Sequence, residues 1–166
     1  MGRTGYHTQE HRIKELEEPI ICRKDNAWLG EAYYFWLEEL DALYWGENAK
    51  RRTGKFGVYI GDIDCENVLD TVFNEEQYEF WVKNVEKAAK QLLKKTGSKP
   101  TLKEINDLFK DKGIWDDIDG ILFQDLSQNP IHFLVEKFQY KKRIQLALYN
   151  KSKLSNFALH YVGDCN

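Results

Sequence analysis

The sequence predicts a single α+β domain over residues 1–166. A length of 166 residues suits one domain, because domains most often hold roughly 100–150 residues. Hydrophobic residues make up 42% of the chain and aromatic residues 14%, which is enough to fill a core and excludes a disordered chain. Segments typical of strands and helices follow one another at unequal intervals. This irregular order favours α+β over the regular alternation of a doubly wound sheet.

The first half of the chain is expected to form three strands and one helix. The strands are expected at 4–8, 32–36 and 56–63. The strand at 32–36 is indicated by an aromatic run that starts at Trp28 and contains few turn-forming residues. Leu37, Leu40, Leu43 and Tyr44 then recur at helical spacing, which predicts a helix over 37–46.

The second half carries clear helix boundaries. Asn74 is expected to cap a helix, with Gln77 at the capping-box position, and Gly97 is expected to end it. Thr101 and Glu104 form a second capping-box pattern, which begins a helix that ends near residue 113. The remaining strands are expected at 120–124, 143–149 and 157–162.

Charge and cysteine content limit the classes of protein. The net charge of −3 and the pI near 5.8 argue against general nucleic-acid binding, which is typical of basic domains. Basic residues do cluster at 50–55 and 141–143, as solvated turns or as contacts to phosphate. Three widely spaced cysteines without a Cys-x-x-Cys pair predict a reduced, cytoplasmic protein rather than a disulfide framework.

Other classes lack their motifs. The polar N-terminus is unlike a signal peptide, and no apolar run reaches the roughly 20 residues of a membrane span. The four histidines form no His-Glu-x-x-His motif or Cys/His cluster, so no metal site is expected.

Several short segments, in order along residues 6–155, resemble one family. The segments are Tyr6-His7-Thr8, Gly30-Glu31-Ala32-Tyr33-Tyr34-Phe35-Trp36, Val58-Tyr59-Ile60, Asn67-Val68-Leu69-Asp70, Asp119-Gly120-Ile121-Leu122 and Leu148-Tyr149-Asn150. Together they are similar to the bacterial and phage ADP-ribosyltransferases of the His-Tyr-Glu type, which are related to diphtheria toxin and the poly-ADP-ribose polymerases. The resemblance implies a split β-sheet with flanking helices and an NAD⁺ cleft.

The resemblance also implies roles for individual residues. His7 would hydrogen-bond the ribose next to adenine, and Tyr34 would stack on the nicotinamide ring. Thr8, Gly30 and Tyr33 would complete the binding of NAD⁺, which is a substrate here, and Tyr33 would lie on the opposite face of the strand. Taken singly, His7 also suits an ordinary polar strand position, and both tyrosines suit a core.

The third catalytic position differs from the family. The family places a Glu on a late strand, where it stabilises positive charge developing on the ribose, and the resemblance puts Gln145 there. Three explanations are open. Asp125 or Glu136 could supply the charge, the domain could bind NAD⁺ or a partner without turnover, or the chain could carry an inactivating Glu→Gln change.

The expected function is therefore NAD⁺-dependent ADP-ribosyl transfer. The resemblance suggests a toxin or phage-conflict effector that modifies an intracellular protein or nucleic acid, with an antitoxin or inhibitor protein as a further partner. The loop at 124–142 would help to select the acceptor. A catalytically inactive binding module is the alternative. A nuclease is a third class, against which the acidic pI and the lack of paired metal-binding carboxylates both argue.

Overall fold

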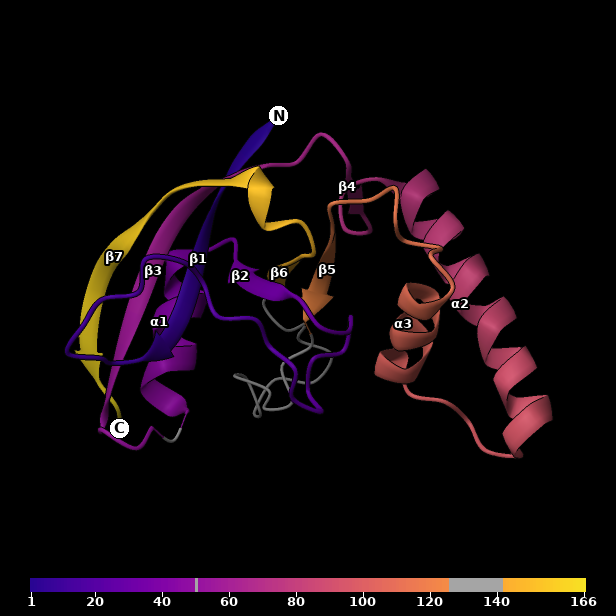
Figure 1. The fold of residues 1–166 in the computed structure, drawn as a ribbon, viewed down its shortest axis with the longest axis horizontal. Helices are drawn as coiled ribbons and strands as arrows, with labels where there is room; N and C mark the ends of the chain where they lie inside the picture. The colour runs from indigo at the N-terminus through magenta and orange to yellow at the C-terminus, as the bar shows by residue number, and fades with distance from the viewer. Residues whose placement is uncertain (50, 126–141) are drawn as a thin grey trace, which may run out of the picture.

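The computed structural model describes residues 1–49, 51–125 and 142–166. The strands, in chain order, are β1 (Gly2–Glu10), β2 (Tyr33–Trp36), β3 (Lys55–Asp64), β4 (Val68–Asp70), β5 (Gly120–Asp125), β6 (Arg143–Leu148) and β7 (Leu154–Asp164). The helices are α1 (Glu39–Asn48), α2 (Glu75–Thr96) and α3 (Leu102–Asp111), and a 3-10 turn covers Lys151–Lys153. Each of the six predicted strands overlaps an observed one, and the predicted α+β class is confirmed (Figure 1).

The seven described strands form one sheet, in the order β4-β5-β6-β2-β1-β3-β7. Neighbouring strands are antiparallel except β4 and β5, which are parallel. The middle of the sheet is narrow, because β1 and β2 share the single pair Tyr6 and Trp36, whereas β1 pairs with β3 along its whole length. The sheet is therefore continuous, but β1 and β2 separate beyond this pair.

One hydrophobic cluster joins the two halves of the sheet. It combines Phe35, Leu122, Leu146 and Leu148 from β2, β5 and β6 with Ile63 from β3, and Leu154 and Phe157 pack against it. Because residues of β3 and β7 contact residues of β2, β5 and β6, the β1–β3–β7 half curls towards the other half.

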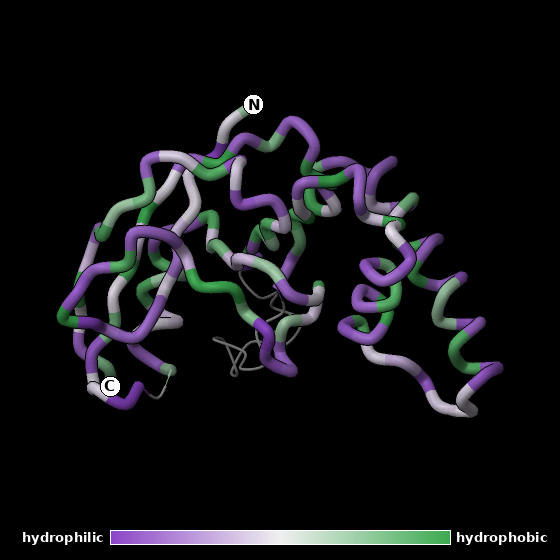
Figure 2. The backbone as a smooth tube through the Cα atoms, viewed as in Figure 1, coloured by the Kyte–Doolittle hydropathy of each residue, from purple (hydrophilic) through white to green (hydrophobic). Residues whose placement is uncertain are grey.

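The helices lie on the other face of the sheet. A cluster of Trp36, Ala42, Phe56 and Val58 seats α1 on β1 and β3. A second cluster seats α2 and α3 near β5 and β6, at the opposite end of the molecule from α1 (Figure 1). Figure 2 shows hydrophobic and hydrophilic residues alternating along α2. Trp81, Val85, Ala89 and Leu92 of this helix pack against the second cluster. No helix within the described residues is long and apolar enough to cross a membrane.

The helix ends follow their capping residues. Asn74 accepts a hydrogen bond from the Gln77 amide, Gly97 ends α2 with a φ of 75°, and Thr101 and Glu104 form a complete capping box. These predictions are confirmed. The Gln77 side chain differs from expectation, because its Oε1 accepts from the Asp70 amide at 2.6 Å rather than closing a box with Asn74. It thereby ties the start of α2 to β4.

The predicted helix over 37–46 is observed as α1, but not all the residues whose spacing predicts it are buried. Leu40 is 71% exposed and Tyr44 48% exposed, whereas Ala42 and Gly46 are buried. The reason is close packing: a Cβ on Gly46 would lie 2.1 Å from Cδ2 of Phe56. Only small residues let α1 approach the sheet this closely, so Ala42 and Gly46 form its buried side and Leu43 packs against the same cluster.

Candidate functional site

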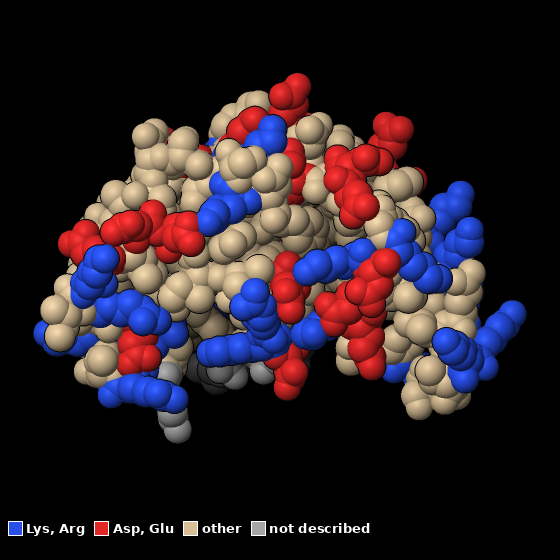
Figure 3. All heavy atoms as spheres, viewed as in Figure 1, with Lys and Arg blue, Asp and Glu red and all other residues tan. Residues whose placement is uncertain are grey.

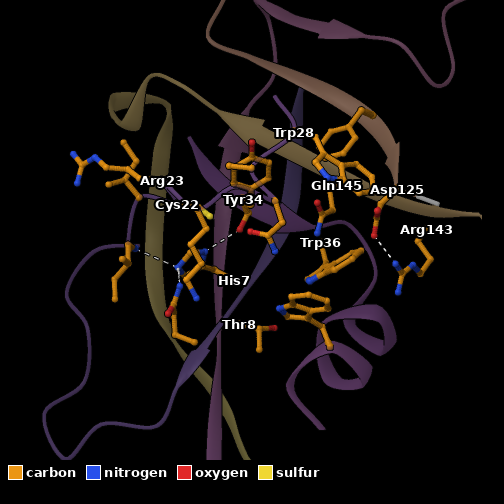
Figure 4. A pocket seen from close by; sticks show the side chains of 18 of the residues that line it. His7, Thr8, Cys22, Arg23, Trp28, Tyr34, Trp36, Asp125, Arg143 and Gln145 are labelled. Carbon is orange, nitrogen blue, oxygen red and sulfur yellow. Dashed lines mark hydrogen bonds and ion pairs between the residues drawn. The ribbon is translucent and has the colours of Figure 1, made fainter. Parts of the chain in front are cut away.

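A cleft of about 600 Å³ lies where β1 and β2 separate (Figure 4). This volume falls within the range of small-molecule sites, roughly 300–1,000 Å³. Strands β1, β2, β5 and β6, helix α1 and the segment 20–28 line it. Of the residues expected to form the site, it brings together His7, Thr8, Tyr34, Asp125 and Gln145.

Strand register explains which side chains share the cleft. Trp36 pairs with Gln145, Gln145 pairs with Phe123, and Asp125 pairs with Arg143. Residues that pair across neighbouring strands lie on the same face of a sheet, and so do residues two apart along one strand. The side chains of these residues and of Tyr34 therefore point to the same side. Tyr33 alternates to the other face, where it packs with the cluster that joins the two halves of the sheet.

His7 bridges the gap between the two central strands. Its Nδ1–H donates to the carbonyl oxygen of Tyr34 at 2.8 Å, in the tautomer that this contact requires. Its Nε2 then accepts from the Ile20 amide and from the Gln9 side-chain amide, each at 3.2 Å. The ring is 3% exposed, and burial lowers its pKa to about 4, with the bond to Tyr34 acting in the opposite direction. His7 is therefore neutral at pH 7, and two donors share its one remaining lone pair.

The Tyr34 ring lines the cleft, and its hydroxyl is hydrogen-bonded to the main chain of residues 29 and 30. The hydroxyl donates to the Gly30 carbonyl at 2.7 Å and accepts from the Leu29 amide at 3.2 Å. Phe123 contacts the ring edge-to-face, with centroids 6.3 Å apart. Burial raises the pKa of Tyr34, so the phenol stays protonated. These contacts fix the ring before any ligand arrives.

Gly30 supports Tyr34 rather than lining this cleft. It has a φ of +81°, which favours glycine, and it lines a separate cavity of about 400 Å³ beside α3. Thr8 likewise has a structural contact, because its hydroxyl donates to the Ala42 carbonyl at 2.9 Å and anchors α1 on β1.

An ion pair lies at the β5–β6 end of the cleft. Arg143 Nη2 lies 2.5 Å from Asp125 Oδ2, and both side chains are less than 15% exposed. The Arg143 guanidinium also stacks over the Trp36 ring at 5.2 Å. Burial raises the pKa of Asp125, and the charge of Arg143 opposes that rise.

Gln145 lies between these aromatic and charged groups (Figure 4). In the described part of the chain its side-chain amide has no hydrogen-bond partner. It can therefore donate to and accept from a ligand, but it carries no charge. Glu136, the other candidate acid, and most of the acceptor loop lie outside the described residues.

Sequence reasoning missed part of this site. Trp45 contacts Trp36 with the two rings tilted and their centroids 6.2 Å apart, and Arg143 bridges Trp36 to Asp125. The basic cluster at 141–143 was the available signal for Arg143. The hydrogen bond from the Ile20 main-chain amide to His7 does not depend on the Ile20 side chain, so no sequence signal could have revealed it. Among the described residues, no three His, Cys, Asp or Glu side chains gather as a metal site would require.

Comparison of the chain with protein-family models, with curated proteins and with solved structures finds no match in any of the three.

Proposed function

We propose that the protein is an NAD⁺-dependent ADP-ribosyltransferase with an ADP-ribosyltransferase-like fold. One observation carries the proposal. The family resemblance assigns NAD⁺-binding or catalytic roles to His7, Tyr34 and Gln145. These residues lie on β1, β2 and β6, and all three line one cleft. In this reaction the bond between the ribose and nicotinamide breaks, its electron pair leaves with nicotinamide, and an acceptor atom bonds to the ribose carbon.

The cleft offers a role to each residue in the proposal. The Tyr34 ring would stack on nicotinamide, since its face is fixed and its hydroxyl is already bonded elsewhere. A ribose hydroxyl would donate to His7 Nε2 in place of the Gln9 amide, because that nitrogen has one lone pair for two donors. The Gln145 amide, which has no partner among the described residues, would hydrogen-bond the ribose attached to nicotinamide.

An inactive NAD⁺-binding module is the second candidate. It is favoured by the charges at the site: Gln145 is neutral, and the carboxylate of Asp125 is bonded to Arg143. Negative charge near the ribose would normally stabilise the oxocarbenium-like transition state. With Asp125 offset by a guanidinium, the cleft supplies less of that stabilisation than a free Glu would.

Nicotinamide release tests the two candidates. Labelled NAD⁺ and cell lysate are incubated with the natural chain, with Gln145→Glu, and with Tyr34→Ala and its matched control Tyr33→Ala, which changes the opposite face of the same strand. The enzyme proposal expects turnover that rises with Gln145→Glu and is lost in Tyr34→Ala but retained in Tyr33→Ala. NAD⁺ binding without release from the natural chain or from Gln145→Glu would establish the binding module instead.

The proposal includes a biological setting. The three cysteines are free thiols, as expected in a reducing cytoplasm. A role as toxin or phage-conflict effector, with a protein or nucleic-acid acceptor and an antitoxin or inhibitor partner, rests on the family resemblance. Mass spectrometry of lysate macromolecules, searching for added ADP-ribose, would identify the acceptor.

A further inference from the structure

Two arginines in the cleft carry buried N–H groups that meet no acceptor. Nε and Nη2 of Arg51 and Nε of Arg143 are shielded from water and lack a hydrogen-bond partner in the described residues. Both side chains line the cleft. A buried donor left unpaired costs roughly 1–3 kcal/mol, and more when it is charged. Such groups therefore call for a partner, and the partner of an N–H group must be an acceptor.

The two Arg51 nitrogens form one edge of the guanidinium. Parallel N–H groups on such an edge match two oxygens of a phosphate or carboxylate. Two neighbours of Arg51 that could accept from this edge are engaged elsewhere: Glu10 accepts from the Thr53 amide at 2.8 Å, and the Cys165 thiol donates to the Gly46 carbonyl. Burial lowers the pKa of Arg51, as expected for a cation without a bonded anion.

The charge of the cleft also favours an anion. Among the described residues that line it, four are basic, Arg23, Lys24, Arg51 and Arg143, and one is acidic, Asp125. The whole chain has 24 basic and 27 acidic residues. The described lining of the cleft is thus more basic than the chain as a whole. Figure 3 shows Lys and Arg side chains along the lower half of one face, with Asp and Glu side chains among them.

The aromatic lining distinguishes phosphate from carboxylate. Tyr34, Trp36 and Trp45 line the same cleft, and Trp45 is 39% exposed. Aromatic faces stack on planar bases, and nucleotides combine such a base with phosphate groups. We propose that the Nε and Nη2 edge of Arg51 binds a phosphate group of a nucleotide ligand held in the cleft. This subsite deepens the proposed function and rests on it only where the ligand is NAD⁺.

Binding measurements with phosphate-bearing and phosphate-free probes test the subsite. Calorimetric titrations compare ADP, adenosine, NAD⁺ and a short single-stranded oligonucleotide against the natural chain, Arg51→Gln, Arg51→Lys and Arg52→Gln. Arg52 is the matched control, because it is the exposed neighbour and does not line the cleft. Thermal melting confirms that each variant is folded.

The subsite predicts that ADP binds at least tenfold more tightly than adenosine. Arg51→Gln should raise the Kd for ADP by about tenfold to a hundredfold, Arg51→Lys by less, and Arg52→Gln by less than twofold. Equal Kd values for ADP and adenosine, equal effects of Arg51→Gln and Arg52→Gln, or no ADP binding would each overturn the subsite.

The same data separate the subsite from the proposed function. If the Kd for NAD⁺ is unchanged by Arg51→Gln, the subsite is disproved but the transferase proposal is not. ADP binding that depends on Arg51, without any NAD⁺ binding, keeps the subsite and removes the transferase proposal. Arg51-dependent binding of the oligonucleotide that is tighter than that of NAD⁺ identifies a nucleic-acid strand as the source of the phosphate.

Discussion

Lowering the pH should destabilise the protein through His7. Burial lowers the pKa of this side chain from 6.5 to about 4, and its hydrogen bond to Tyr34 opposes part of that shift. In the unfolded chain the imidazole regains its ordinary pKa near 6.5. Between pH 6.5 and 4 the unfolded chain therefore binds a proton that the folded chain does not. The free energy of unfolding must fall as the pH falls through this window.

The size of the effect follows from the two pKa values. The favourable contribution of neutral His7 is complete above pH 6.5, declines by about 1.4 kcal/mol for each pH unit within the window, and levels off below pH 4. Between pH 7 and pH 4.5 the two pKa values give a loss of roughly 2.4 kcal/mol from His7 alone. This loss is a large part of the roughly 5–15 kcal/mol that stabilises a typical domain.

Urea unfolding of the natural chain and of His7→Gln at pH 7, 6, 5 and 4.5 measures this contribution. Glutamine does not titrate, and its amide retains a donor for the Tyr34 carbonyl. Other titrating groups act equally on both chains, so the difference between the chains isolates His7. The stability of the natural chain relative to His7→Gln should fall by about 2.4 kcal/mol between pH 7 and 4.5. A difference that is constant with pH would refute the assignment of His7 as a buried neutral imidazole.

Two further substitutions test the packing around the cleft. Tyr34→Phe removes the donor to Gly30 and should lower stability by about 2 kcal/mol and the Tm by roughly 4–8 °C in scanning calorimetry; an unchanged Tm would contradict this bond. Gly46→Ala should destabilise by about 1–3 kcal/mol in urea unfolding, because its Cβ would lie 2.1 Å from Phe56, although Ala otherwise favours helices. Gly2→Ala, whose Cβ would meet nothing nearer than 3.7 Å, is the control, and equal losses in both variants would disprove the close approach of α1.

Local chemistry made much of the fold predictable. Asn74, Gly97, Thr101 and Glu104 set helix ends through contacts within a few residues, which a sequence displays directly. Strands β2, β3, β5 and β6 contain short apolar or aromatic runs. The three-residue β4 was not predicted as a strand, because its parallel pairing with β5 joins segments about 50 residues apart and leaves no local pattern.

The face of α1 and the contacts of the site depend on distant residues. Gly46 is buried because Phe56 lies beneath it, and the leucine spacing contains no information about Phe56. The sequence pointed to His7 and Tyr34 as a pair, but their link is a side chain bonded to a main-chain carbonyl. Their joint location in the cleft follows from strand order, which the residue pattern did not predict.

The charge balance of the cleft connects its two proposed roles. In the proposed subsite, the N–H groups of Arg51 and Arg143 that have no partner among the described residues would bind oxyanions. The proposed transfer reaction would instead need negative charge near a ribose that becomes positive. Asp125 is the one acidic residue among the described residues of the lining, and it is paired with Arg143. If a phosphate engaged the free Nε of Arg143, the guanidinium would be shared between two anions and Asp125 would be less fully neutralised. The same ligand that the arginines bind could thus restore part of the charge that Gln145 lacks.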